Sequence, residues 1–275
     1  MTVAVFGASG QIGHLLLPRL RARGEQVLAV SREPRADGDG LHWVQGSLPD
    51  AVPALTQVGA IVSFGPLLPF ARWLAAAAPA GAPRIVATSS MSAQSKADSD
   101  VPAEREIARQ LREGEAELAA ACARLGYRWT VLRPTLIYGA GRDKSLTPIA
   151  RRAMRTRLFP RPAGRGLRQP VHADDIARAA LAAIDRPADR VLMLGGGERL
   201  RAGEMFARVQ HSLPVATLAV PVPAWLLRLA RHVVPRLRGP LTRLEADLIA
   251  DNGELEAMLG IHPRPFRPDK DCWSP

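Results

Sequence analysis

The chain of 275 residues is 47% hydrophobic and carries a formal net charge of +11, from 37 Lys and Arg against 26 Asp and Glu. This length and apolar content allow a large buried core, and no stretch is long and apolar enough to predict a membrane-spanning helix. Because the N-terminal residues enter a strand directly, without a signal peptide, and only two cysteines are present, we expect a cytoplasmic protein with no disulfide framework and no metal site.

Arginine supplies nearly all of the positive charge, since the only lysines are Lys96, Lys144 and Lys270. A basic protein can attract nucleic acid, an anionic surface or an anionic small molecule. Between residues 142 and 168 the chain is strongly basic, yet Phe159 is the single aromatic side chain there that could stack on a base. We therefore expect a small anionic substrate rather than nucleic acid.

The first strand-like run, residues 3–6, leads directly into three glycines, Gly7, Gly10 and Gly13, and then into an apolar helix. In this order the first glycine permits a tight turn, the second admits a pyrophosphate, and the third lets the helix pack against the strand. Pro18 is expected to kink or shorten that helix. The sequence predicts a dinucleotide-binding loop made of Gly7, Ala8, Ser9, Gly10, Gln11 and Ile12.

The second predicted strand, residues 26–30, ends in Ser31 and Arg32, about twenty residues beyond the glycines. An NAD site usually has a carboxylate here for the ribose 2′-hydroxyl, whereas a hydroxyl and a guanidinium suit a 2′-phosphate. The adjacent carboxylate of Glu33 would instead favour NAD(H). On balance the residues favour NADP(H) over NAD(H).

Strand and helix patterns then alternate, which predicts an α/β Rossmann fold, a doubly wound parallel sheet, with a smaller and mostly helical C-terminal substrate part. We expect residues 1–165 to form the NAD(P)-binding domain and residues 166–275 to add returning elements and a substrate-binding or lid region. Further strands are predicted at 42–45, 60–64, 84–88, 129–132 and 191–194. Helices are predicted at 50–57, 70–78, 103–125, 146–157, 174–184, 203–211, 223–234, 241–250 and 254–259.

Four motifs together resemble the extended short-chain dehydrogenase/reductases, and among them the nucleoside-diphosphate-sugar epimerases and dehydratases. They are Gly7-xx-Gly10-xx-Gly13, Ser89-Ser90, Leu132-Arg133-Pro134-xxx-Tyr138-Gly139 and Pro170-Val171-His172-x-Asp174-Asp175. The resemblance implies that Ser90 takes the place of the catalytic serine and that Ser92 neighbours the substrate. It also implies cofactor contacts from Phe64, Gly65, Pro66, Thr88, Ser89, Pro134, Thr135 and Leu136, and substrate contacts from Arg142 and Arg168.

The resemblance breaks at the Tyr-x-x-x-Lys pair, in which the lysine lowers the pKa of a tyrosine that moves a proton. Counting back from Glu115, the positions of the pair fall on Ile107 and Leu111. Ser90, Ser92, Lys96 and His172 remain as acid/base candidates. Of these, His172 is better interpreted as a packed residue that hydrogen-bonds the backbone, and Asp175 as a helix cap. The acidic residues that dehydratases carry after the serine are also missing, since Met91 and Ser92 stand there, and this disfavours a dehydratase.

Two functions are compatible with these residues. The first is an NADP-binding oxidoreductase or epimerase-like enzyme for an anionic, nucleotide-sugar-like substrate; the alternative is a catalytically silent NADP-binding sensor or assembly factor. The basic, amphipathic segment 223–234 could contact a membrane surface, but a lid over the substrate is the favoured interpretation. A homodimer is compatible with the sequence.

Overall fold

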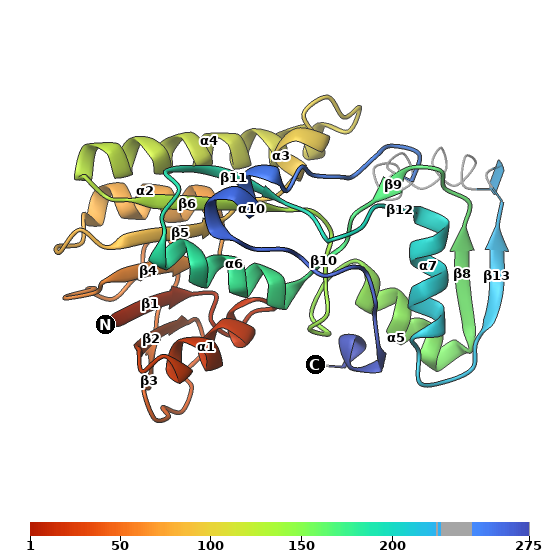
Figure 1. Ribbon diagram of the computed structural model, residues 1–275, viewed down its shortest axis with the longest axis horizontal. Helices are drawn as coiled ribbons and strands as arrows, with labels where there is room; N and C mark the ends of the chain where they lie inside the picture. The colour runs from red at the N-terminus through yellow and green to blue at the C-terminus, as the bar shows by residue number, and fades with distance from the viewer. Residues whose placement is uncertain (224, 227–243, 275) are drawn as a thin grey trace.

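Seven parallel strands form the central sheet, in the order β11-β6-β5-β4-β1-β2-β3 (Figure 1). The computed structural model describes residues 1–223, 225–226 and 244–274. The reversal of strand order beside β1 makes this a doubly wound, Rossmann-like sheet, which confirms the predicted fold class. The strands are β1 (Thr2–Phe6), β2 (Gln26–Ser31), β3 (Leu41–Gln45), β4 (Ala60–Ser63), β5 (Arg84–Thr88), β6 (Trp129–Pro134) and β11 (Arg190–Leu194).

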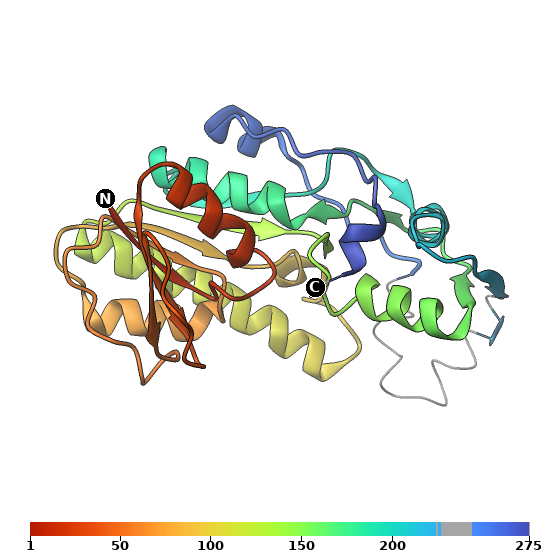
Figure 2. The same ribbon diagram turned by 90° about the horizontal axis from the view of Figure 1, so that it is seen from below.

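Helices cover both faces of the sheet (Figure 2). Val3 and Val5 of β1 contribute to the core beneath α1 (Gly13–Ala22) and α6 (Ala173–Asp185). The alternate residues of the same strand, Ala4 and Phe6, belong to the core beneath α2 (Leu67–Ala77) and α4 (Pro102–Leu125). Because both sides of β1 are buried, the strand is an apolar run without polar alternation.

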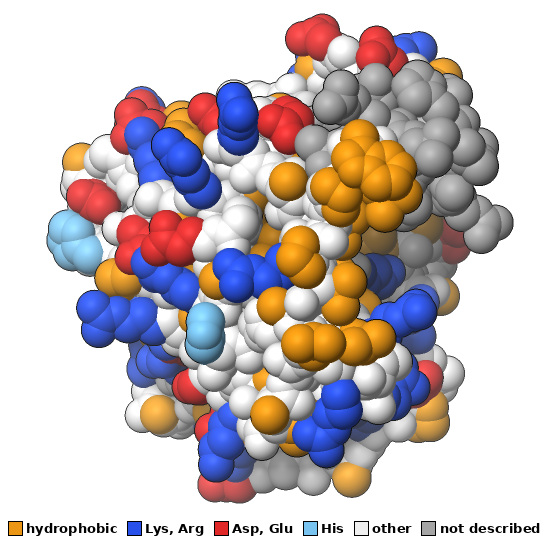
Figure 3. Space-filling model, turned by 90° about the vertical axis from the view of Figure 1, so that its right-hand side faces the viewer, with side chains coloured by type: hydrophobic (Ala, Val, Ile, Leu, Met, Phe, Trp, Pro, Cys, Tyr) orange, Lys and Arg blue, Asp and Glu red, His pale blue; other side chains and the backbone are white. Residues whose placement is uncertain are grey.

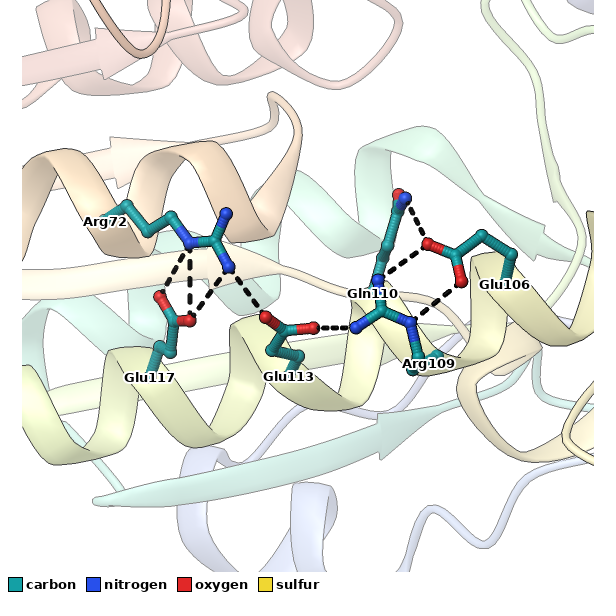
Figure 4. A network of polar contacts seen from close by, with 6 residues as sticks. All are labelled: Arg72, Glu106, Arg109, Gln110, Glu113 and Glu117. Atoms are coloured by element: carbon teal, nitrogen blue, oxygen red, sulfur yellow. Dashed lines mark hydrogen bonds and ion pairs between the residues drawn. The ribbon is translucent and has the colours of Figure 1, made fainter.

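α4 packs along α2 and turns a charged face to solvent (Figure 4). Arg72 of α2 pairs with Glu113 at 2.7 Å and with Glu117 at 3.2 Å, and Glu113 also pairs with Arg109. These side chains are largely exposed, as the amphipathic sequence of the helix predicts.

A smaller lobe beside the sheet contains α5 (Leu146–Thr156), α7 (Ala202–His211) and the parallel pair β8 (Leu158–Pro162) and β13 (Leu218–Val222). Its core includes Tyr138, Phe159, Phe266 and Trp273. Short strand pairs connect this lobe to the sheet. They are additional to the helices that the sequence predicts for this part of the chain. The remaining elements are α3 (Ser92–Ser95), β7 (Ile137–Tyr138), β9 (Leu167–Arg168), β10 (Val171–His172), β12 (Leu200–Arg201), α10 (Gly253–Leu259) and the 3₁₀ turn η2 (Lys270–Trp273).

Hydrophobic side chains gather on the outer side of this lobe (Figure 3). Large exposed ones there are Leu158 of β8, Leu218 and Val220 of β13, and Trp225 and Leu226 just beyond. Among the described residues, no helix is both long and apolar enough to cross a membrane. The predicted helix 223–234 lies mostly outside the described residues.

Three local predictions were wrong. Residues 50–57 are irregular rather than helical, because Pro53 removes an amide donor and disfavours helix at the residue before it. Residues 244–250, the described end of the predicted helix 241–250, are also not helical. Pro18 does not shorten α1, which continues to Ala22; it lies on the exposed face, where water can satisfy the carbonyl that its missing N–H leaves unbonded.

Candidate functional site

The glycine loop connects β1 to α1 at the switch point of the sheet. Gly7 has φ +70°, and the Gly10 N–H donates to its carbonyl at 2.9 Å. A Cβ on Gly13 would lie 2.4 Å from the Gly7 oxygen, so only glycine allows the helix to start this close to the strand. α1 has no side-chain cap and no acidic residue in its first turn. The positive end of its dipole can therefore attract an anion such as a dinucleotide diphosphate.

Two arginines lie at the end of β2, where the sequence predicts the 2′-phosphate. Arg32 is exposed and has no ion-pair partner among the described residues. Arg35 extends over the Trp43 ring at 5.2 Å and approaches the hydroxyl of the buried Ser31 at 3.4 Å. Glu33 points to solvent and lies 4.0 Å from Arg35. A role for Arg35 was not predicted from the sequence, because its stacking partner Trp43 lies eight residues away on β3.

The other residues predicted to contact the cofactor lie at the ends of β4, β5 and β6. The Phe64 N–H donates to the Phe6 carbonyl at 3.0 Å, and Gly65 and Pro66 follow at the start of α2. The Thr88 hydroxyl is 3.5 Å from the Ser63 carbonyl. These contacts fix the backbone at the sheet edge where ligands bind in doubly wound proteins.

A pocket of about 340 Å³ brings together residues that are distant in the chain. From the predicted site it contains Gln11, Ser90, Ser92, Pro134, Thr135 and Leu136. It also contains Lys96, Asp143 and Lys144, which are the ionisable groups among its described lining residues. The amide nitrogen of Gln11 is buried and has no hydrogen-bond partner in the described part of the chain. The glycine loop thus contributes Gln11 to the lining of the pocket, and the amide of this residue is an unsatisfied donor.

Ser90 is oriented by its own turn. Its hydroxyl oxygen accepts the Ser92 N–H at 3.1 Å, which leaves the hydroxyl proton available to a substrate oxygen. The turn is fixed to β6 because the Met91 N–H donates to the Pro134 carbonyl at 2.9 Å.

Ser89 points away from the pocket into a buried ion pair. Its hydroxyl donates to Glu115 at 2.5 Å, and Arg133 forms two hydrogen bonds with the same carboxylate. This cluster joins α4, β5 and β6 directly beneath the Ser90 turn. This cluster could not be expected from the sequence, because its three residues come from three separate segments.

Asp143 lines the pocket, but its carboxylate is engaged by the residues that follow it in the chain. It is buried, and its carboxylate accepts hydrogen bonds from the N–H groups of Ser145, Leu146 and Thr147 and from two of their hydroxyls. This pattern caps the first turn of α5. The other ionisable groups among the described residues that line the pocket are Lys96 and Lys144.

His172 and Asp175 are structural. The His172 ring accepts the Asp174 N–H at 3.1 Å and caps α6, which confirms the packed interpretation. Burial and the nearby Arg264 guanidinium lower the pKa of His172. The prediction that Asp175 caps this helix was wrong, because its carboxylate is fully buried against Arg264 at 2.9 Å.

The two predicted substrate-binding arginines lie in different places. Arg142 is exposed and donates to the Ser9 carbonyl in the glycine loop. Arg168 is buried and donates to the carbonyls of Leu167 and Ala246, both at 2.7 Å, and this burial lowers its pKa. Neither arginine lines the pocket.

The sequence matches a family described as NAD(P)H-binding over residues 7–187. The chain belongs to this family. A UDP-glucose 4-epimerase of Vibrio cholerae is 26% identical over 140 residues, which are 47% of this chain and 42% of that relative. The match therefore covers less than half of the relative.

Solved structures extend the fold similarity over nearly the whole chain. MoeE5 in complex with UDP-glucuronic acid and NAD superposes with a TM-score of 0.72 at 20% identity, over 96% of this chain and 94% of that one. A UDP-N-acetylglucosamine 4-epimerase from Bacillus cereus gives a TM-score of 0.71 at 13% identity, over 99% and 94%. The expected resemblance to nucleotide-sugar epimerases is thereby confirmed for the fold, and the family that the chain belongs to is the NAD(P)H-binding one.

Proposed function

We propose that the protein is an NADP(H)-dependent oxidoreductase or epimerase-like enzyme that acts on an anionic nucleotide sugar without the usual Tyr-Lys pair. The observation that carries this proposal is the shared pocket of Gln11, Ser90, Ser92 and Lys96 beside the glycine loop. Its position at the carboxyl ends of the strands supports a substrate held against the nicotinamide.

The preference for NADP(H) rests on the end of β2. Arg32 and Arg35 provide two guanidinium groups next to the Ser31 hydroxyl, a donor set suited to a phosphate rather than to a ribose hydroxyl. Glu33, the residue that would favour NAD(H), is directed to solvent and towards Arg35. We expect NADPH to bind more tightly than NADH.

The nicotinamide, when bound, supplies or accepts the hydride. The chain must then hold the substrate oxygen and move one proton. The Ser90 hydroxyl has a free proton to donate to that oxygen. The Lys96 ammonium, held 4.0 Å from Glu104, is the partly buried cation of the pocket and can give up a proton as a carbonyl is reduced. Lys144 is more exposed and suits an anionic group of the substrate.

The silent alternative is favoured by one observation. α4 contains neither tyrosine nor lysine, and Ile107, one of the positions implied for the pair, is 42% exposed. A sensor or assembly factor would retain the dinucleotide without turnover.

The experiment incubates the purified protein with NADPH or NADP⁺ and a panel of UDP- and GDP-linked keto sugars and sugars, and measures cofactor absorbance and product. We expect turnover with at least one, and a Lys96→Met variant with kcat lowered about 10²- to 10⁴-fold but unchanged NADPH affinity. Lys270→Met, an exposed lysine outside the pocket, is the matched control. Tight NADPH binding without hydride transfer to or from any substrate would establish the silent alternative instead.

A further inference from the structure

Arg142 connects the two halves of the molecule at the glycine loop. It follows β7 on the loop that leads to α5, and its guanidinium donates a hydrogen bond to the carbonyl of Ser9, 133 residues earlier in the chain. Its side chain is exposed, and no carboxylate of the described residues lies within ion-pair distance of it. The contact uses one of the five N–H donors of a guanidinium and leaves the others for a ligand.

The loop that carries Arg142 is fixed on both sides. The Gly141 N–H donates to the Cys272 carbonyl at 2.9 Å, and Arg151 of α5 donates to the carbonyls of Gly141 at 2.8 Å and Trp273 at 3.1 Å. In both ribbon views the C-terminal turn lies beside the start of α5 (Figures 1 and 2). On the following side, Asp143 caps α5. The guanidinium is therefore mounted on a rigid loop, which lowers the entropy lost on binding.

The surroundings of Arg142 match a diphosphate. Ser9 belongs to the glycine loop, which leads directly into the N-terminus of α1. That helix has no acidic residue in its first turn. A positively charged helix end and an unpaired arginine thus converge on the same loop. A guanidinium binds phosphate oxygens with charge-assisted hydrogen bonds in a fork geometry.

We propose that Arg142 is a cofactor-binding residue that grips the diphosphate of the dinucleotide from outside the glycine loop, and that the C-terminal turn holds it in place. This replaces the expectation that Arg142 binds the substrate. The inference depends on the NAD(P)H-binding family and the Arg142–Ser9 contact, and it stands whether or not the protein turns over a substrate.

The diphosphate is common to NAD and NADP, whereas the 2′-phosphate belongs to NADP alone. Affinities for the two cofactors therefore distinguish the role of Arg142 from that of Arg32. Binding of NADPH and NADH is measured by fluorescence titration on the full chain without substrate. We expect Arg142→Gln to weaken both cofactors by a similar factor, about tenfold or more. We expect Arg32→Gln to weaken NADPH far more than NADH. Arg155→Gln removes the same charge from an exposed site on α5 and is expected to change neither affinity more than about twofold.

Two further measurements make the result decisive. Binding of UDP without cofactor tests the other source of a diphosphate; a loss confined to UDP would overturn the proposal and return Arg142 to the substrate. The salt dependence of NADH binding should be shallower in Arg142→Gln than in the natural chain, because one charged contact is removed. Unchanged affinities in Arg142→Gln, an equal loss in Arg155→Gln, or an unchanged salt dependence would each contradict it.

Discussion

The two faces of α4 carry the same kind of ion pair in opposite surroundings. On the outer face, the Arg72 and Glu113 side chains are 57% and 29% exposed, and they belong to a ladder that continues through Arg109 (Figure 4). On the inner face, the Arg133 and Glu115 side chains are 13% and 8% exposed, and the Glu115 carboxylate also accepts a hydrogen bond from the Ser89 hydroxyl. The outer pairs are solvated by water, whereas the inner pair is solvated mainly by its own partners.

The difference in burial assigns the two faces different roles. A surface pair gains little free energy, because water screens the charges and two long side chains lose conformational freedom. A buried pair is costly to break, because the remaining charge has no solvent. The inner pair also joins α4 to β6, and Ser89 attaches the end of β5 to it beneath the Ser90 turn. We infer that it fixes the geometry of the pocket, while the outer ladder contributes mainly solubility.

Removing one partner of the inner pair should give the largest effect. Arg133→Met leaves the Glu115 carboxylate buried without its cation, and we expect a loss of about 3–5 kcal/mol in the free energy of unfolding. Urea denaturation measures it. The double variant Arg133→Met/Glu115→Gln, which removes both charges, should recover part of the loss. Equal stability of the single variant and the natural chain would show that the pair is not desolvated in solution.

The partly buried imidazole of His172 should make the free energy of unfolding depend on pH. Burial lowers the pKa of His172 below its ordinary value of 6.5, so the unfolded chain binds a proton more readily than the folded one. We therefore expect the free energy of unfolding to decrease as pH falls below about 6.5. Protonation at Nδ1 would also remove the cap that Asp174 uses. His172→Asn keeps a capping oxygen without the titration and should flatten the profile; parallel profiles would contradict this.

The outer ladder should give the smallest effect. Glu117→Gln removes one carboxylate that faces Arg72, and we expect Tm to change by less than about 2 °C. High salt should abolish even this difference. A change as large as that of Arg133→Met would mean that burial is not what separates the two faces of α4.

The sequence predicted those parts of the site that depend on short-range chemistry. The glycine loop was predicted because Gly7, Gly10 and Gly13 each meet a steric need within one turn, and the structure shows the close approach at Gly13. The inner strands of the central sheet, such as β1 and β4, were predicted because both their faces are buried and the runs are almost continuously apolar. β8 and β13 were missed, since Pro160, Pro162 and Pro221 mask a strand pattern that edge strands tolerate.

Contacts between distant segments could not be predicted. Nothing near Asp175 indicates that Arg264 will occupy its carboxylate, and so the sequence suggested a cap instead. Nothing near Ser9 indicates Arg142. Such pairings depend on how the smaller lobe closes on the sheet, which one sequence without a fold does not specify. The cofactor contacts at the strand ends and the role of Arg168 as a ligand of a substrate phosphate stay predictions.

The anchoring of the Arg142 loop also has a consequence for protein synthesis. Arg151 and the Trp273 carbonyl that it holds are 122 residues apart in the chain. At translation rates of about 5–20 residues per second, the second partner emerges roughly 6–24 seconds after the first. The glycine loop and the early strands can thus assemble on the ribosome well before the arginine is fixed beside them. A nascent chain should first acquire a loosely held nucleotide site, which tightens when residues 269–274 arrive.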